Sequence, residues 1–309
     1  MPPAFGASFA PGWLTAALAL HVLNQVARAC GWWALVRRTV PAGALRRQDV
    51  LAAWVAGSGA GGVASARGAD AVRLLLVSTR TRDAPWGRLA GTLVVESAGE
   101  TVLAVATVAA AVALGAWSLP AWSPADGLVF AGAAAILAGA VWSVRRRPRA
   151  QRLARDVRAG VAATGSCAGY ARAVLPWQLA SRGLRAGALV CALQAFALPV
   201  LAGAVVLLLV AEGGGRLVPF APAGAATTAA ILVAGAPGAT GGVVAGSALA
   251  ACFLAFAAAR TLLGIALSAV LVVRFVPVRT ALRALTAGGL RRWWCGARRR
   301  LRPGSTAAP

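Results

Sequence analysis

Two acidic residues stand inside an otherwise apolar stretch of the sequence. The stretch 89–116 reads as a membrane helix, in which Glu96 and Glu100 are spaced to lie on one face, one turn apart. An acid within the membrane costs about 2.5–3.5 kcal/mol on insertion scales, so it normally faces a cavity or a cationic partner. The pair predicts either a polar cavity that binds a charged headgroup or a proton, or a hydrated pair near the cytoplasmic end of the helix, tied to nearby arginines.

Arg260 is a second candidate, because it is the only charged residue between positions 217 and 273. A guanidinium in a helix that otherwise contains no charge needs an anionic partner, unless its side chain extends to the membrane interface. Besides a lipid phosphate, the sequence offers three carboxylates, Glu96, Glu100 and Glu212. We expect Arg260 to line the same cavity as Glu96.

Asp70 and Arg73 are three residues apart, so they can form an ion pair on a helix surface. Such pairs are usually solvated. Their position just before the helix that carries the two acids also makes them candidates for a binding site. The predicted substrate-binding residues are therefore Asp70, Arg73, Glu96, Glu100 and Arg260.

Glycine and proline residues interrupt two apolar segments, 50–66 and 219–238. The glycines of the first segment spell GxGxxG, but this fingerprint indicates a dinucleotide site only between a strand and a helix. Close helix packing through small residues, or an unwound turn, explains them better. We expect broken or re-entrant helices with turns at two sets of residues: Gly57, Gly59 and Gly62, and Pro219, Pro222 and Gly224.

The composition assigns these residues to a membrane protein. Of 309 residues, 59% are apolar and only 13% are charged, a balance that soluble globular proteins rarely have. All 31 basic residues are arginines, against 8 acidic residues, and they cluster between long uncharged stretches instead of covering one face as in a nucleic-acid-binding domain. Five scattered cysteines and one histidine offer no metal-site spacing, and no metal or cofactor is predicted.

The apolar runs predict an all-α, polytopic membrane protein with about seven or eight transmembrane helices, since each crossing needs about 20 apolar residues. We expect a retained first helix that continues to Val36, one helix over 186–211 with Arg182 and Arg185 at its inner half, a short helix near 224–236 and a longer one over about 243–273. The uncharged runs are 1–27, 101–125, 127–144, 186–211 and 217–259.

Orientation follows from the arginine-rich loops, which stay in the cytoplasm. By this rule 67–88, 145–158 and 274–302 are cytoplasmic, whereas 117–126 is external. Eight passes with both termini inside keep these three segments in the cytoplasm but leave the arginine cluster 37–47 outside. The alternative is seven passes with an external N-terminus, in which 50–66 enters and returns on one side. We expect the basic tail 276–309 to bind anionic lipids along the inner membrane surface, or else to be a tail without specific contacts.

Five features, taken in order, resemble the transmembrane region of lysylphosphatidylglycerol synthases and a related family of uncharacterised flippase-like membrane proteins. They are an Arg/Trp-rich helix edge at 28–33, the stretch Gly-Ala-Asp-Ala-Val-Arg at 68–73, the acids Glu96 and Glu100, a Pro/Gly-rich turn at 219–224, and Arg260 in the last long helix. Two positions depart from the family pattern. Ser97 stands where the family commonly has arginine, and 225–229 lacks the usual glutamate.

The resemblance implies a flippase-like transmembrane domain over 1–275 and a basic cytoplasmic tail over 276–309, in a bacterial plasma membrane. It implies a protein that binds and translocates a phospholipid or a lipid-linked headgroup, without the soluble aminoacyl-transferring domain of the full synthases. Its expected partners are membrane lipids with anionic or lipid-linked headgroups. A homo-oligomer or a complex with a partner synthase is also compatible with the resemblance. No binding to nucleic acid is expected. The alternatives are a membrane enzyme acting on a lipid-linked phosphate or sugar, and a non-catalytic accessory subunit.

Overall fold

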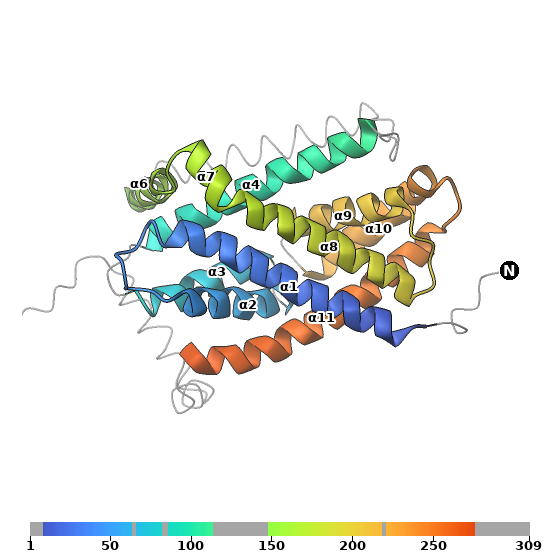
Figure 1. Ribbon diagram of the computed structural model, residues 1–309, viewed down its shortest axis with the longest axis horizontal. Helices are drawn as coiled ribbons and strands as arrows, with labels where there is room; N and C mark the ends of the chain where they lie inside the picture. The colour runs from blue at the N-terminus through green and yellow to red at the C-terminus, as the bar shows by residue number, and fades with distance from the viewer. Residues whose placement is uncertain (1–8, 64–65, 82–85, 114–147, 218–220, 276–309) are drawn as a thin grey trace, which may run out of the picture.

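The computed structural model describes residues 9–63, 66–81, 86–113, 148–217 and 221–275. Within these ranges the chain forms ten helices and no strand, which confirms the all-α prediction (Figure 1). In chain order the helices are α1 (Pro11–Val36), α2 (Arg47–Val63), α3 (Ala66–Ser78), α4 (Trp86–Ala113), α6 (Pro148–Ala163), α7 (Cys167–Ala173), α8 (Leu175–Ala195), α9 (Ala202–Leu217), α10 (Ala221–Thr240) and α11 (Gly246–Phe275). The predicted helix over 127–144 and the tail 276–309 lie outside the described residues.

The same order of helices occurs twice along the chain. α1 is followed by two shorter helices that pack on each other, α2 and α3, and then by the long α4; α8 is followed in the same way by the packed pair α9 and α10 and then by the long α11. Along the long axis of the molecule α1 and α8 run in opposite directions, and so do α4 and α11 (Figure 1). We call α1–α4 the first half and α8–α11 the second half, and their arrangement is inverted.

α1 and α8 lie side by side and join the two halves. At one end the backbone N–H of Ala10 donates to the carbonyl of Ala195 at 3.0 Å. Between the helices the buried Ser181 hydroxyl donates to Oδ1 of Asn24 at 2.6 Å. Near the other end Gly31 faces Trp177, where an added Cβ would lie 3.4 Å from Cβ of Trp177, in van der Waals contact.

The predicted turn at Gly57, Gly59 and Gly62 is wrong, because α2 is continuous through all three residues. The first two are contact positions instead. A Cβ at Gly57 would lie 2.8 Å from the carbonyl oxygen of Ala69 on α3, and one at Gly59 would collide with Gly264 on α11. Of the two explanations that the sequence offered for these glycines, close helix packing applies at Gly57 and Gly59.

α2 and α3 form an antiparallel hairpin. α2 ends at Val63 and α3 begins at Ala66, and Gly57 lies against Arg73 while Gly61 lies against Ala69, a pairing that only antiparallel helices give. α3, with 13 residues, is shorter than a membrane crossing requires, and α2, with 17, is at the lower limit. The hairpin is compatible with the seven-pass topology, in which this segment enters and returns on one side.

The second predicted break falls between two helices. α9 ends at Leu217 and α10 begins at Ala221, so Pro222 and Gly224 lie in the first turn of α10. Proline is accommodated there, because the first N–H groups of a helix have no partner within it. Pro219 lies outside the described residues.

The apolar run 186–211 is not one helix, contrary to the prediction. α8 ends at Ala195 and α9 begins at Ala202, and between them Ala197 has φ 53°, in the left-handed region that a right-handed helix excludes. Pro199 lies in the same short segment and has no N–H to donate. Because α8 already begins at Leu175, Arg182 and Arg185 lie in its middle and not at the edge of an apolar helix.

The division of the run 217–259 into two helices is confirmed, although its first helix is longer than the predicted 224–236. α10 continues through Pro237 to Thr240. Gly241 and Gly242 then adopt φ values of 61° and 78°, which favour glycine, and α11 follows from Gly246.

Two of the helices among the described residues are long and apolar enough to cross a membrane, over Trp86–Ala113 and Gly246–Leu271. Large apolar side chains on them face outward: Val102 is 67% exposed, Leu262 is 68% exposed and Val270 is 71% exposed. Such surfaces are compatible with a lipid environment. The predicted number of seven or eight crossings does not follow from two helices and stays a prediction.

Candidate functional site

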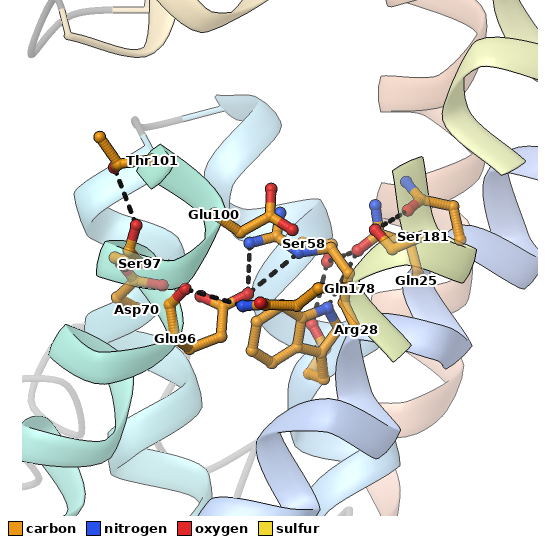
Figure 2. Close-up of polar contacts among 12 residues, drawn as sticks. Gln25, Arg28, Ser58, Asp70, Glu96, Ser97, Glu100, Thr101, Gln178 and Ser181 are labelled. Atoms are coloured by element: carbon orange, nitrogen blue, oxygen red, sulfur yellow. Dashed lines mark hydrogen bonds and ion pairs between the residues drawn. The ribbon is translucent and has the colours of Figure 1, made fainter. Parts of the chain in front are cut away.

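The first charged cluster joins α1 to α4. Nε and Nη2 of Arg28 donate to Oε1 of Glu96 at 3.2 and 2.6 Å, and the two side chains are only 15% and 5% exposed (Figure 2). The side-chain amide of Gln178, on α8, donates to the backbone carbonyl of Glu96 at 3.1 Å. Three helices therefore converge on this one acidic residue.

Trp54, on α2, supplies an aromatic surface for two cations of this cluster. The guanidinium carbons of Arg28 and Arg73 lie 5.1 and 3.8 Å from its ring centroid, so both arginines make cation–π contacts. The indole is fully buried, and its N–H donates to Oε1 of Gln25 at 3.1 Å. One indole thus stabilises two positive charges inside the protein.

Arg73 pairs with Asp70, as their spacing predicted. Nη1 of Arg73 donates to Oδ1 of Asp70 at 2.7 Å, and Nη2 of Arg73 donates to Oγ of Ser58 at 3.2 Å. The Arg73 side chain is 10% exposed, whereas that of Asp70 is 42% exposed. The pair therefore extends from the buried cluster to the surface of the first half.

Glu100 connects α4 to α8, and so connects the two halves. Nη2 of Arg182 lies 3.8 Å from Oε2 of Glu100 and donates to the backbone carbonyl of Glu100 at 2.7 Å. Oε1 of Glu100 is buried and has no hydrogen-bond partner among the described residues. The carboxylate of Glu100 is consequently held more loosely than that of Glu96.

Arg260 belongs to a second cluster, in the second half. Its Nη1 donates to Oε1 of Glu212, on α9, at 2.7 Å, and Nε of Arg185, on α8, donates to Oε2 of the same carboxylate at 2.7 Å. Arg260 also lies 5.5 and 5.6 Å from the ring centroids of Phe253 and Phe256. One carboxylate thus bridges two arginines from different helices.

The structure divides the predicted site between these clusters. Glu212 is the partner of Arg260, and no ion pair joins Glu96 to Arg260 among the residues that the structure describes. The two clusters are linked through adjacent helical turns. Glu96 and Glu100 lie one turn apart on α4, and Arg182 and Arg185 lie one turn apart on α8. We call the whole set the charged network: Arg28, Asp70, Arg73, Glu96, Glu100, Arg182, Arg185, Glu212 and Arg260.

Arg28 belongs to the charged network although it was not among the predicted binding residues, and the same is true of Arg182, Arg185 and Glu212. Arg28 is the first charge after 27 uncharged residues, and the same helix continues for eight residues beyond it, so the argument made for Arg260 applies to it too. His21, Gln25 and Arg28 also follow a helical period, which places a polar stripe on an apolar helix. Trp54 and Gln178 have no comparable signal, because an isolated tryptophan or glutamine is common in any helix.

Tyr170, on the short helix α7, borders the network. Its hydroxyl donates to Oε1 of Gln178 at 2.9 Å, and Gln178 in turn contacts Glu96. Burial raises the pKa of Tyr170, the hydrogen bond to Gln178 opposes this shift, and the charges of Glu96 and Glu100 add to it. The phenol therefore stays protonated and remains a hydrogen-bond donor at physiological pH.

The network holds five arginines and four carboxylates, so its formal charge is positive. Such a site favours an anion over a cation, and the loosely held Glu100 is the point at which an exchange of partners costs least. Within the described ranges, no three side chains of the His, Cys, Asp and Glu types lie close enough together to hold a metal ion.

The chain was compared with protein families, curated proteins and solved structures. No protein-family model, curated protein or solved structure matches it. The family resemblance therefore rests on the order of its motifs, and the function has to be argued from the charged network and the helices that carry it.

Proposed function

We propose that this chain is a multi-pass membrane protein of flippase type, which binds and translocates a phospholipid or a lipid-linked headgroup. The observation that carries the proposal is the charged network, which runs from the first half to the second half through largely buried positions. Ionisable residues inside a membrane are costly, and they usually mark the path of a charged substrate. An excess of arginine suits a headgroup that carries phosphate.

The inverted arrangement of the two halves supports the same proposal. Many transporters consist of two inverted halves, with short helices near the membrane midplane and a substrate site where the halves meet. Here α2–α3 and α9–α10 are the short pairs, and Glu100 and Arg182 meet across the two halves at 3.8 Å. Rocking of one half against the other would change this contact, whereas the ion pairs at 2.6–2.7 Å each lie within one half.

The distribution of arginines supports the proposed orientation. Arg37, Arg38, Arg80 and Arg88 lie at the end of the molecule where α1 and α3 finish and α4 begins. The opposite end contains the segments 196–201 and 241–245, which carry no charge. By the positive-inside rule the arginine-rich end faces the cytoplasm, in keeping with a plasma-membrane protein whose C-terminus is inside. With Arg37 and Arg38 inside, the start of α1 lies outside, and this orientation supports the seven-pass alternative, in which α2 and α3 form a hairpin.

A transport assay tests the proposal. The purified full-length protein is placed in vesicles with a trace of lipid carrying a fluorescent headgroup, and a membrane-impermeant reductant reports how much of that lipid reaches the outer leaflet. We expect headgroup-dependent movement in the wild type and its loss in Glu96→Gln and in Arg260→Leu. Arg37→Gln is the matched control, because it removes a charge from an exposed position outside the network and should leave transport intact. Wild-type transport in both network variants would refute the assignment.

A second candidate is a non-catalytic accessory subunit, in which the charges only hold helices together. It is favoured by the close ion pairs that most members of the network already make with each other. The same vesicles separate the candidates, with lipid extraction as a second readout. Movement of an unchanged headgroup supports the flippase, a chemically altered lipid supports a membrane enzyme, and neither result supports the accessory subunit.

A further inference from the structure

α6 differs from the other helices in its direction and in its surface. It is seen nearly end-on in Figure 1, whereas α1, α8 and α11 run along the molecule, and it lies at the arginine-rich end, close to the start of α4. If the long helices cross the membrane, a helix in this direction at the end of the molecule lies parallel to the membrane surface. Its position therefore suits a helix at the level of the lipid headgroups.

Glycines fix α6 firmly to α4. A Cβ at Gly91 would lie 2.9 Å from Cα of Gly160, and a Cβ at Gly160 would collide with the backbone of Arg88. A Cβ at Gly87 would lie 3.3 Å from Cδ1 of Leu153. The helices are thus in backbone contact, so α6 cannot move away from α4 without losing this packing.

The remaining surface of α6 is strongly amphipathic. Arg152, Arg155 and Arg158 are exposed, and at 100° per residue Arg155 and Arg158 lie opposite the face that contacts α4. The apolar Val161 remains 38% exposed on one flank, and Leu153, at the edge of the contact with α4, remains 45% exposed. A basic face beside an exposed apolar flank is what a helix needs to bind an anionic membrane surface.

We propose that α6 is an in-plane helix that binds the anionic lipids of the cytoplasmic leaflet, with Val161 at the acyl boundary and Arg155 and Arg158 at the phosphates. The occupant is a lipid surface and not an acidic protein, because the apolar flank would stay exposed beside a purely ionic partner. Since α6 is fixed to α4, this lipid contact is made directly on the helix that carries Glu96 and Glu100. The inference concerns lipid contact and does not depend on transport.

The first test places an environment-sensitive fluorophore on α6 of the full-length protein. Cys167, which is exposed, and Cys295 are replaced by serine, whereas the buried Cys30, Cys191 and Cys252 are kept. A cysteine is then introduced and labelled either at Val161 or at Ala159, which lie on opposite flanks of the helix. In vesicles of phosphatidylcholine and phosphatidylglycerol, we expect the Val161 label to be shielded from aqueous iodide and the Ala159 label to be quenched. Equal quenching of both labels would overturn the proposal.

The second test measures which lipid lies beside α6. Quenching of the Val161 label by spin-labelled phosphatidylglycerol is compared with quenching by spin-labelled phosphatidylcholine. Each arginine near the surface should enrich the anionic lipid roughly fivefold at low salt, and the enrichment should fall at high salt. We expect it to disappear in Arg155→Gln/Arg158→Gln and to persist in Arg37→Gln/Arg46→Gln, which removes as much charge elsewhere at the same end. An equal loss of lipid enrichment in both double variants would mean that the enrichment comes from the general surface charge, and it would refute a lipid-binding site on α6.

Discussion

The Arg28–Glu96 pair allows a quantitative test of whether the charged network is buried. The single variants Arg28→Leu and Glu96→Gln each leave one charged partner behind, whereas Arg28→Leu/Glu96→Gln removes both charges. Glu96 is 5% exposed and Arg28 is 15% exposed, so the carboxylate left alone in Arg28→Leu has almost no access to water. Removing one partner of a buried pair costs about 3–5 kcal/mol, and we expect Arg28→Leu to fall in that range.

The other two variants should cost less, for different reasons. In Glu96→Gln the amide oxygen can still accept the hydrogen bonds of Arg28, which lie at 2.6 and 3.2 Å, so a loss of about 1.5–3 kcal/mol is expected for a charge-assisted bond. The double variant leaves no unpaired charge and should cost less than Arg28→Leu. The coupling energy from the double-mutant cycle should then be about 2 kcal/mol or more, at the upper end for residues in contact.

The measurement is reversible unfolding of the full-length protein in mixed micelles, followed by the fluorescence of its tryptophans. Asp70→Asn serves as an internal comparison, because the Asp70 side chain is 42% exposed and its pair with Arg73 should contribute only about 0.2–1 kcal/mol. A coupling energy between Arg28 and Glu96 as small as this would mean that water reaches the pair. That result would refute both the burial of the network and the proposal built on it.

Three further predictions concern packing, topology and titration. Gly59→Ala should destabilise the protein by about 1–3 kcal/mol, because the new methyl group collides with Gly264, whereas Gly183→Ala, with no atom within 4 Å, should be neutral or stabilising; equal effects would contradict the α2–α11 contact. A cysteine at the exposed Gln151 should react with an impermeant reagent only after cells are opened, and labelling of intact cells would place α6 outside. Tyr170 is the only tyrosine, so an ultraviolet titration of tyrosine reports this residue alone. Its pKa should lie above 10 in the folded protein and near 10 after unfolding. Because the folded state then holds the proton more tightly, the free energy of unfolding should decrease as the pH rises above 10. A folded-state pKa at or below 10 would show that Tyr170 is solvated.

The sequence predicts helices well where apolar runs are long, and less well where a short irregularity divides them. The all-helical fold and the turn at Gly241 and Gly242 follow from composition and local residue types. The division of 186–211 does not, because a single Pro199 in an apolar run is also compatible with a kinked membrane helix. A glycine at position 57 or 59 is compatible with a turn and also with a close helix contact. Only the packing of the neighbouring helices distinguishes the two.

Part of the charged network was predictable from single residues, but its pairing was not. An isolated charge in an apolar helix identifies Glu96, Glu100 and Arg260 without any structure. Which acid meets which arginine depends on helix contacts between residues 27–82 positions apart, and no local spacing encodes them. The local pair Asp70–Arg73 is the exception, since helix geometry alone brings together residues three apart.

The inverted halves place opposite charge requirements on their connecting segments. Equivalent segments of the two halves end on opposite sides of the membrane, so the rule that retains arginine on one side must remove it from the counterpart. The segment after α1 contains Arg37, Arg38 and Arg46, whereas the equivalent segment after α8, 196–201, contains no charge. Selection for a fixed orientation would therefore drive the connecting segments of two duplicated units apart, even while their helices kept the same pairing. A common ancestry of the halves should be sought in their helix contacts and not in their loops.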